Sequence, residues 1–432
     1  GYGDAYYFAG DFNDYTTKRQ ISNFLFADTF FRLISFDRAG DVTNFYWNFY
    51  EPLMKKIFKD ILKNPVTDEE YEDQQIARVD ESGFQVLLGD NWQDFAIKGF
   101  NINGEAPGNE RYQYSREYTY YASLLQSLGN MGGNCVRTYD LLPPEFYRAL
   151  SEYNRSADTP IYLIQGIMTP PSIDPANTAE NMEAIKTNIA AAISAVHGEG
   201  TIKENGTKEE TAYAYNAAPY VIAYILDPRF DGATTDALFS KDDLKDSYNG
   251  TYISASSNVV EALAAELCDY TLDFQQKTYG CMQPVSICVG AERLEGASWI
   301  VPGQKTYNIS RLAVSESAEN LYFTSYSLET DDQALLDSER LFAEKYADTK
   351  GNFAWGGYIQ EVKALINGPV LIDRAGLSTN YNMFEQESSV NGLSEQEQGN
   401  GIVRMLQTAD TQGYIGTVSY THLRAHETDS YL

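Results

Sequence analysis

Eight short apolar runs recur between residues 84 and 418, and longer segments with helical periodicity separate them. The runs are AIKGFNI, NCVRTY, PIYLIQGI, PYVIAYIL, PVSICVG, LYFTSYS, PVLID and YIGTV. Strands that alternate with helices in this way are typical of a parallel sheet with helices packed against it. Eight βα units are the number that closes a (β/α)8 barrel. We therefore predict an α/β fold, a TIM barrel over residues 84–418.

The helical segments that separate the runs support this prediction. They cover residues 115–131, 143–154, 179–197, 258–279, 333–347, 358–366 and 395–411. Asp331 and Asp332 precede the fifth segment and are suitable helix caps. An open doubly wound sheet is the alternative, but no glycine-rich phosphate loop follows the first strand, which argues against it.

The two ends of the chain depart from the repeating pattern. Residues 1–80 are rich in aromatic side chains and include an amphipathic segment at 51–63. We interpret them as the tail of a preceding domain or as an N-terminal α+β appendage. Residues 419–432 carry His422 and His426 and resemble translated sequencing adapter at the end of a metagenomic reading frame. They would then be non-native and the last βα unit incomplete; a genuine polar tail is the alternative.

Charge and composition argue against several kinds of partner. The chain has 61 acidic and 32 basic residues and a net charge of -29, so nucleic acid would be repelled. No run reaches the roughly 18 apolar residues that a membrane-spanning helix needs. The cysteines are not closely paired and only three histidines exist, so neither a metal site nor a cofactor is predicted. The 33 tyrosines would suit stacking on sugar rings, although tyrosine also fills cores.

One stretch resembles a known family of barrels. NCVRTYDLLPPEFYRALSEYN, followed by PIYLIQGI, is similar to the second and third βα units of bacterial glycoside-hydrolase-like barrels, in the superfamily of retaining β-glucanases and β-galactosidases. The similarity runs from about residue 84 to 417 and is most specific between 99 and 167. It implies the (β/α)8 fold and shared ancestry, and it implies activity only where the site residues match.

Both catalytic glutamates of that superfamily are missing here. The acid/base glutamate of the relatives stands in a segment like LGxEWDP after the fourth strand, and ILDPRFDG places Arg229 at that position. The nucleophile of the relatives stands in PVLVxEFG, and PVLIDRAG places Arg374 there, with Gly376 fixing the register. The histidine and Tyr-Pro that follow the sixth strand of the relatives are also replaced.

Arginine cannot take over either catalytic role. A retaining glycosidase needs one carboxyl group to protonate the leaving oxygen and a carboxylate about 5 Å away to attack the anomeric carbon. Guanidinium keeps its proton near neutral pH and has no acceptor atom. The resemblance therefore predicts a catalytically degenerate domain of a bacterial extracellular or cell-surface protein, which binds carbohydrate or has a structural role. Strand alternation predicts that Asp227 enters the barrel mouth and that Asp373 points into the surrounding layer.

Other interpretations stay open. An active retaining glycosidase or transglycosylase on a β-linked polysaccharide would use displaced carboxylates, with Asp227, Asp231, Glu292 and Glu329 as candidates. The arginines could bind an acidic polysaccharide, and the acidic surface could make the domain a protein-binding scaffold. Arg137 matches the arginine that supports the nucleophile in the superfamily. The candidate substrate-binding residues are Arg137, Tyr139, Asn101, Tyr326 and Trp299.

Overall fold

A computed structural model describes most of the chain from residue 74 onward. The described residues are 74–102, 114–157, 159–168, 173, 175–203, 210–377 and 393–419. The chain divides into two compact units, Gly1–Glu72 and Asp73–Leu432. The first unit, with the amphipathic segment 51–63, lies outside the described residues. The same holds for residues 420–432 of the predicted tail.

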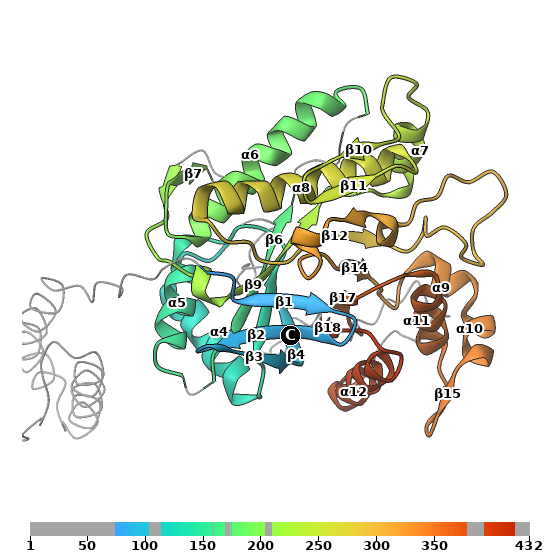
Figure 1. The fold of residues 1–432 in the computed structure, drawn as a ribbon. Helices are drawn as coiled ribbons and strands as arrows, with labels where there is room; N and C mark the ends of the chain where they lie inside the picture. The colour runs from blue at the N-terminus through green and yellow to red at the C-terminus, as the bar shows by residue number, and fades with distance from the viewer. Residues whose placement is uncertain are drawn as a thin grey trace, which may run out of the picture. The chain divides into compact units, whose positions relative to one another are not determined.

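Eight parallel strands form a closed barrel, which confirms the predicted fold (Figure 1). Each strand begins inside one of the eight apolar runs, and β18 pairs with β4 to close the ring. The strands are β4 (Ile97–Ile102), β5 (Cys135–Thr138), β6 (Tyr162–Met168), β9 (Val221–Asp227), β12 (Val285–Gly290), β14 (Thr324–Ser327), β17 (Val370–Ala375) and β18 (Gly416–Ser419).

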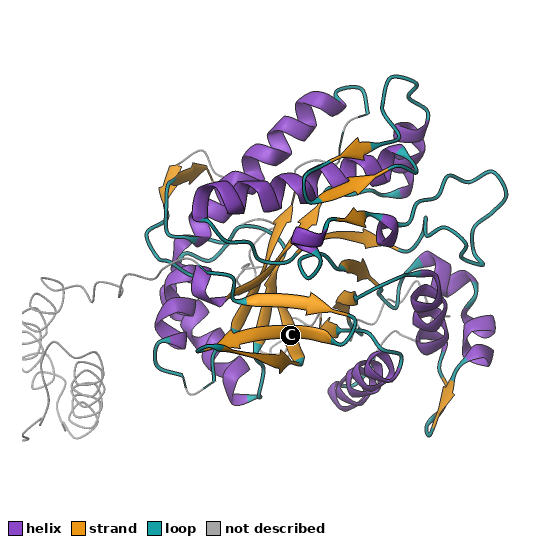
Figure 2. Ribbon diagram, viewed as in Figure 1, coloured by secondary structure: helices purple, strands orange, loops and turns teal. Residues whose placement is uncertain are grey.

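The helices lie outside the strands, as Figure 2 shows. Those described are α4 (Tyr118–Asn130), α5 (Pro144–Asn154), α6 (Thr178–Val196), α7 (Gly232–Phe239), α8 (Val259–Tyr279), α9 (Gln333–Asp337), α10 (Glu339–Lys345), α11 (Ala354–Leu365) and α12 (Glu395–Thr411). All the predicted helical segments are present, and α7 is an additional helix. No helix in the described part of the chain is both long enough and apolar enough to span a bilayer.

Local signals set several helix ends. Asn258 caps α8 by accepting a hydrogen bond from the Glu261 backbone, and Ser394 and Glu397 form a capping box at α12. Asp332 stands at the N-cap of α9, but the predicted capping bond is absent. Its carboxylate instead accepts hydrogen bonds from the Glu329 backbone and the Tyr358 hydroxyl.

A three-stranded antiparallel sheet closes the amino-terminal end of the barrel. It consists of β1 (Ala77–Asp80), β2 (Gly83–Leu88) and β3 (Asn91–Phe95). Gln283, just before β12, accepts hydrogen bonds from the backbone of Ile76 and Ala77, and Phe84 packs edge-on against Phe323. Part of this sheet lies in the predicted N-terminal appendage, 1–80. Functional sites of this fold lie at the opposite, carboxyl-terminal end.

The barrel strands divide their side chains between two cores. On β17, Leu371 belongs to the inner core, while Val370 and Ile372 belong to the outer core beneath the helices. Around β14, Phe323 is in the inner core and Tyr326 in the outer core. Because successive strand residues point to opposite faces, these assignments show which polar residues face the barrel interior.

Candidate functional site at the barrel mouth

A buried ion pair lies inside the barrel near the carboxyl ends of its strands. Arg137 Nη2 on β5 lies 2.9 Å from Asp373 Oδ2 on β17, and neither side chain has exposed surface. Asn101 on β4 donates from Nδ2 to the backbone oxygen of Asp373 at 3.0 Å. The predicted site residues Arg137 and Asn101 thus meet at one residue: Arg137 at the Asp373 carboxylate and Asn101 at its backbone oxygen.

The predicted direction of Asp373 is wrong. Leu371 faces the inner core, so Asp373, two residues later, points the same way. The pairing of β14 with β17 also shifts here, because Tyr326 pairs with Ile372 but the next residue of β14 pairs with Arg374. An irregularity of this kind redirects side chains, which explains how Arg374 reaches the mouth as well.

Tyr139 follows β5 and contacts two arginines. The guanidinium carbons of Arg137 and Arg374 lie 4.3 and 4.6 Å from the centroid of the Tyr139 ring, within the range of cation–π contacts. Arg374 Nε lies 3.3 Å from Glu329 Oε1, just beyond β14, and these two side chains are 27% and 26% exposed. A sugar could stack on Tyr139 only on ring surface that the guanidinium groups leave open.

Arg229, at the predicted acid/base position, makes different contacts. Its Nη2 lies 2.8 Å from Met168 Sδ at the end of β6. Arg229 is the one non-glycine residue of the described chain with a positive φ, 54°. Its backbone nitrogen donates to Asp227 Oδ1 at 3.1 Å. Burial raises the pKa of the Asp227 carboxyl, and the positive charge of Arg137 opposes this shift.

The other displaced-carboxylate candidates lie in different settings. Asp231 caps α7, its carboxylate accepting from the Thr234 backbone at 2.7 Å. Burial raises the pKa of Glu292, which follows β12. Burial also raises the pKa of Glu329, and the positive charge of Arg374 opposes that second rise. Among the described residues, no three histidine, cysteine, aspartate or glutamate side chains are grouped so that they could hold a metal ion.

Asp332 is an acid of this region that sequence reasoning missed. Burial raises its pKa from 3.8 to about 7, and nearby Glu329 adds to the rise. The Tyr358 hydroxyl donates to its Oδ2 at 3.0 Å and counteracts part of that rise. The only signal in the sequence was the pair of aspartates at a helix start, which indicates a cap and carries no information about burial.

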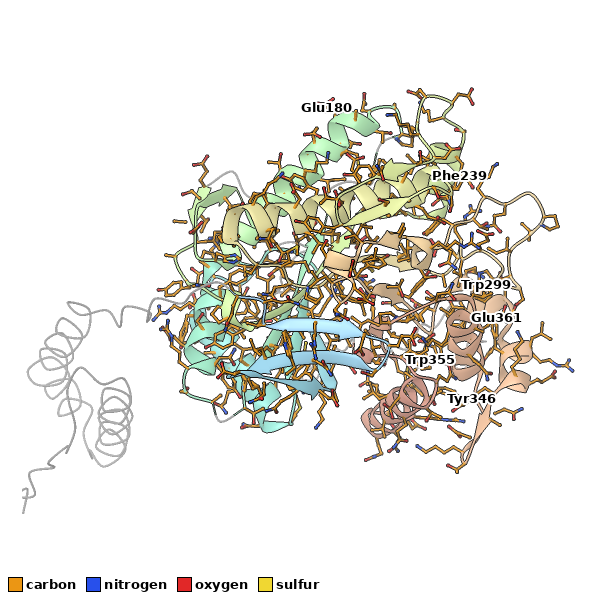
Figure 3. The ribbon with its side chains drawn as sticks, in the orientation of Figure 1. Glu180, Phe239, Trp299, Tyr346, Trp355 and Glu361 are labelled. Atoms are coloured by element: carbon orange, nitrogen blue, oxygen red, sulfur yellow. The ribbon has the colours of Figure 1, made fainter. Side chains whose placement is uncertain are left out.

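Two predicted sugar-binding aromatics pack against protein. Tyr326 is 1% exposed and belongs to the outer core, because its neighbour Ser325 takes the inward position. Trp299 donates from Nε1 to the Ala291 backbone oxygen and packs against Tyr358, with ring centroids 5.3 Å apart. Figure 3 shows Trp299 next to Glu361 of α11. The structure thus gives both rings packing roles and leaves only Tyr139 of the predicted aromatics at the mouth.

The backbone at the end of β5 packs directly against Gly166 on β6, where there is no room for a side chain. A Cβ atom at this glycine would lie 1.9 Å from the backbone oxygen of Thr138 and 2.7 Å from that of Tyr139. We expect Gly166→Ala to lower the free energy of unfolding by about 1 to 3 kcal/mol, because backbone must move to admit the methyl group. Gly399→Ala in α12, where a Cβ meets no atom within 4 Å, is the matched control and should stabilise slightly. Equal stability of both variants in urea unfolding would contradict the crowding argument.

Comparisons with known sequences give no match: no protein-family model fits the chain, and no curated protein resembles it significantly.

Solved structures of similar fold include several glycoside hydrolases. A β-glucuronidase of Bacteroides uniformis has 10% identity and a TM-score of 0.44, over 80% of this chain and 32% of that one. An endocellulase of Pyrococcus horikoshii has 10% identity and a TM-score of 0.48, over 80% and 91% of the two chains. A broad-specificity endoglucanase from an uncultured bacterium has 11% identity and a TM-score of 0.40, over 76% and 87%.

The chain spans about a third of the length of the β-glucuronidases, with 32% of each covered. Likeness at this level concerns the barrel alone and carries no functional argument. The (β/α)8 fold itself rests on the pairing of the eight strands.

Proposed function

We propose that the barrel mouth binds an acidic saccharide without cleaving it. The observation that carries the proposal is the placement of Arg374. It stands at the position that the family resemblance assigns to the nucleophile, and its guanidinium group is held by the Tyr139 ring and Glu329. A partly exposed cation beside an aromatic ring suits a sugar that carries a carboxylate.

Glu329 would compete with such a ligand for Arg374. Its raised pKa means that it gives up its negative charge at a higher pH than an ordinary glutamate does. A saccharide carboxylate, which keeps a low pKa, would then replace it as the partner of the guanidinium group. Two parallel hydrogen bonds from arginine to a carboxylate are stronger and more directional than the single contact to Glu329.

Cleavage is disfavoured by burial as well as by charge. An attacking carboxylate must come within about 3 to 3.5 Å of the anomeric carbon. Asp373, the acid paired with Arg137, has no exposed surface and is also shorter than glutamate by one methylene group. Arg374 adds positive charge at a mouth where the glycosidase transition state would itself be positive.

Calorimetric titration tests the proposal with oligogalacturonides as the acidic probe and cello-oligosaccharides as the neutral one. We expect the acidic probe to bind, Arg374→Met to weaken binding by about tenfold or more, and Glu329→Gln to strengthen it several-fold. Arg340→Met, which removes an arginine that is 90% exposed on α10, is the control and should change nothing. Equal binding of both probes, or an unaffected Arg374→Met, would sink the acidic-sugar assignment.

Two observations favour a second candidate, an active retaining glycosidase with displaced carboxylates. Asp227 has a raised pKa, as a general acid requires, and Asp373 is held by Arg137, the arginine that the resemblance links to the nucleophile. This candidate predicts turnover of aryl β-glycosides that is lost in Asp227→Asn and in Asp373→Asn but retained in Asp231→Asn. The absence of turnover in the unmodified protein would remove it.

A further inference from the structure

The side chains at the mouth form layers of decreasing exposure. Arg374 and Glu329, about a quarter exposed, form the outer layer, and the half-buried Tyr139 contacts Arg374. Arg137 contacts the same ring and forms, with Asp373, a fully buried layer. We call Arg374, Tyr139 and Glu329 the plug, because they are more exposed than the buried pair and Tyr139 contacts both Arg374 and Arg137.

The interior around the buried pair is polar. Several of its buried atoms have no hydrogen-bond partner among the described residues: Asn101 Oδ1, Arg137 Nε and Nη1, Ser325 Oγ and Asp373 Oδ1. Buried groups of this kind cost free energy unless something polar reaches them. The set offers both donors and acceptors, which is what the hydroxyl groups of a sugar require.

We propose that the plug is a gate: separation of Arg374 from Glu329 releases Tyr139 and opens the polar interior around Arg137 and Asp373 to saccharide hydroxyl groups. This inference rests on the proposed function and adds its regulation, because the same arginine that would bind the acidic sugar also closes the site. An acidic ligand that takes Arg374 away from Glu329 would open the gate, and so would protonation of Glu329.

The groups that face Glu329 determine when it takes up a proton. The charge of Arg374 favours the ionised form of Glu329, whereas the charges of Asp331 and Asp373 disfavour it. The Glu329 backbone nitrogen also donates a hydrogen bond to the Asp332 carboxylate. Burial is the largest influence and raises the pKa of Glu329. The negative charge that holds Arg374 is therefore lost at a milder acidity than for an exposed glutamate, and the gate opens as the pH falls.

Cys288 provides a natural reporter of gate opening. It is a buried residue of the inner core on β12. Burial raises the pKa of its thiol, the nearby charge of Asp373 adds to the rise, and the charge of Arg137 opposes it. Cys268 on α8 is also buried but belongs to the outer core. A local opening at the mouth exposes only the first thiol, whereas general loosening of the protein exposes both.

The test is thiol labelling of the full chain at neutral pH, with each cysteine followed by peptide mass spectrometry. We expect Glu329→Gln to speed labelling of Cys288 by about fivefold and to leave Cys268 unchanged, as expected for loss of one partly exposed ion pair. Arg374→Met, which removes the same contact from the other side, should give the same result. Glu319→Gln, at an exposed glutamate before β14, is the matched control.

An unchanged rate at Cys288 in both variants would overturn the gate, and so would a parallel rise at Cys268. Labelling requires no saccharide. A failure of sugar binding would therefore count against the proposed function alone, and a failure of selective labelling would count against the gate alone.

Discussion

Replacing Asp373 by alanine is expected to lower the free energy of unfolding by about 3 to 5 kcal/mol at neutral pH. The substitution leaves Arg137 buried and charged without its ion-pair partner, since the two side chains have no exposed surface and lie 2.9 Å apart. Guanidinium cannot give up its proton to escape this cost, as a buried lysine would. Urea unfolding followed by tryptophan fluorescence measures the loss.

Two further variants show whether the loss of stability comes from leaving a buried charge unpaired or from losing an ion pair as such. Arg137→Met combined with Asp373→Leu should recover much of the lost stability, because an apolar pair in a buried site often matches or exceeds the ion pair. Glu344→Ala removes the partner of Arg340 in an exposed pair and should cost less than about 1 kcal/mol. A loss below 1 kcal/mol for Asp373→Ala would show that the interior already solvates the arginine.

The barrel was predictable because its strands are apolar on both faces. A segment such as PYVIAYIL is buried against the inner core on one side and against helices on the other, so it stands out from its surroundings. The strand β3, with the sequence NWQDF, has mostly exposed side chains and carries no such signal. Its place is set by pairing with β2, which is a tertiary effect.

The helices also differ in whether the local sequence or the tertiary structure determines their boundaries. The segment predicted as one helix at 333–347 is two, α9 and α10, which meet at Ser338. The additional helix α7 contains two β-branched threonines, which disfavour helix. Asp231 offsets this by capping its first turn. Asp231 is predicted from the sequence only as a candidate catalytic acid, and the sequence alone did not show that this residue starts a helix.

The candidate site was predictable where strand alternation is regular. Alternation places Arg137 and Tyr139, two residues apart, on the same face, and they are in contact because nothing interrupts the end of β5. On β17 a motif aligned on the nucleophile put Arg374 inside and Asp373 outside. The pairing with β14 skips Asp373, and both side chains reach the interior side. A shift of register depends on the neighbouring strand, so the sequence of β17 alone could not reveal it.

Asp332→Asn is expected to raise the free energy of unfolding by about 4 kcal/mol at pH 8. The carboxyl has a pKa of about 7 in the folded protein, against 3.8 for its unperturbed value. Asparagine has no charge to desolvate, and its amide oxygen can still accept the hydrogen bonds from Tyr358 and the Glu329 backbone.

The sign of this effect follows from the raised pKa of Asp332. Below about pH 4 the group is protonated in both the folded and the unfolded chain, so its burial costs little. As the pH rises towards 7 the unfolded chain ionises first, and the protein loses up to about 1.4 kcal/mol per pH unit from this group. The variant and the unmodified protein should therefore be equally stable near pH 4 and diverge until about pH 7. Asp242→Asn, at an exposed aspartate, is the matched control. A constant difference at every pH would mean that folding does not change the pKa of Asp332.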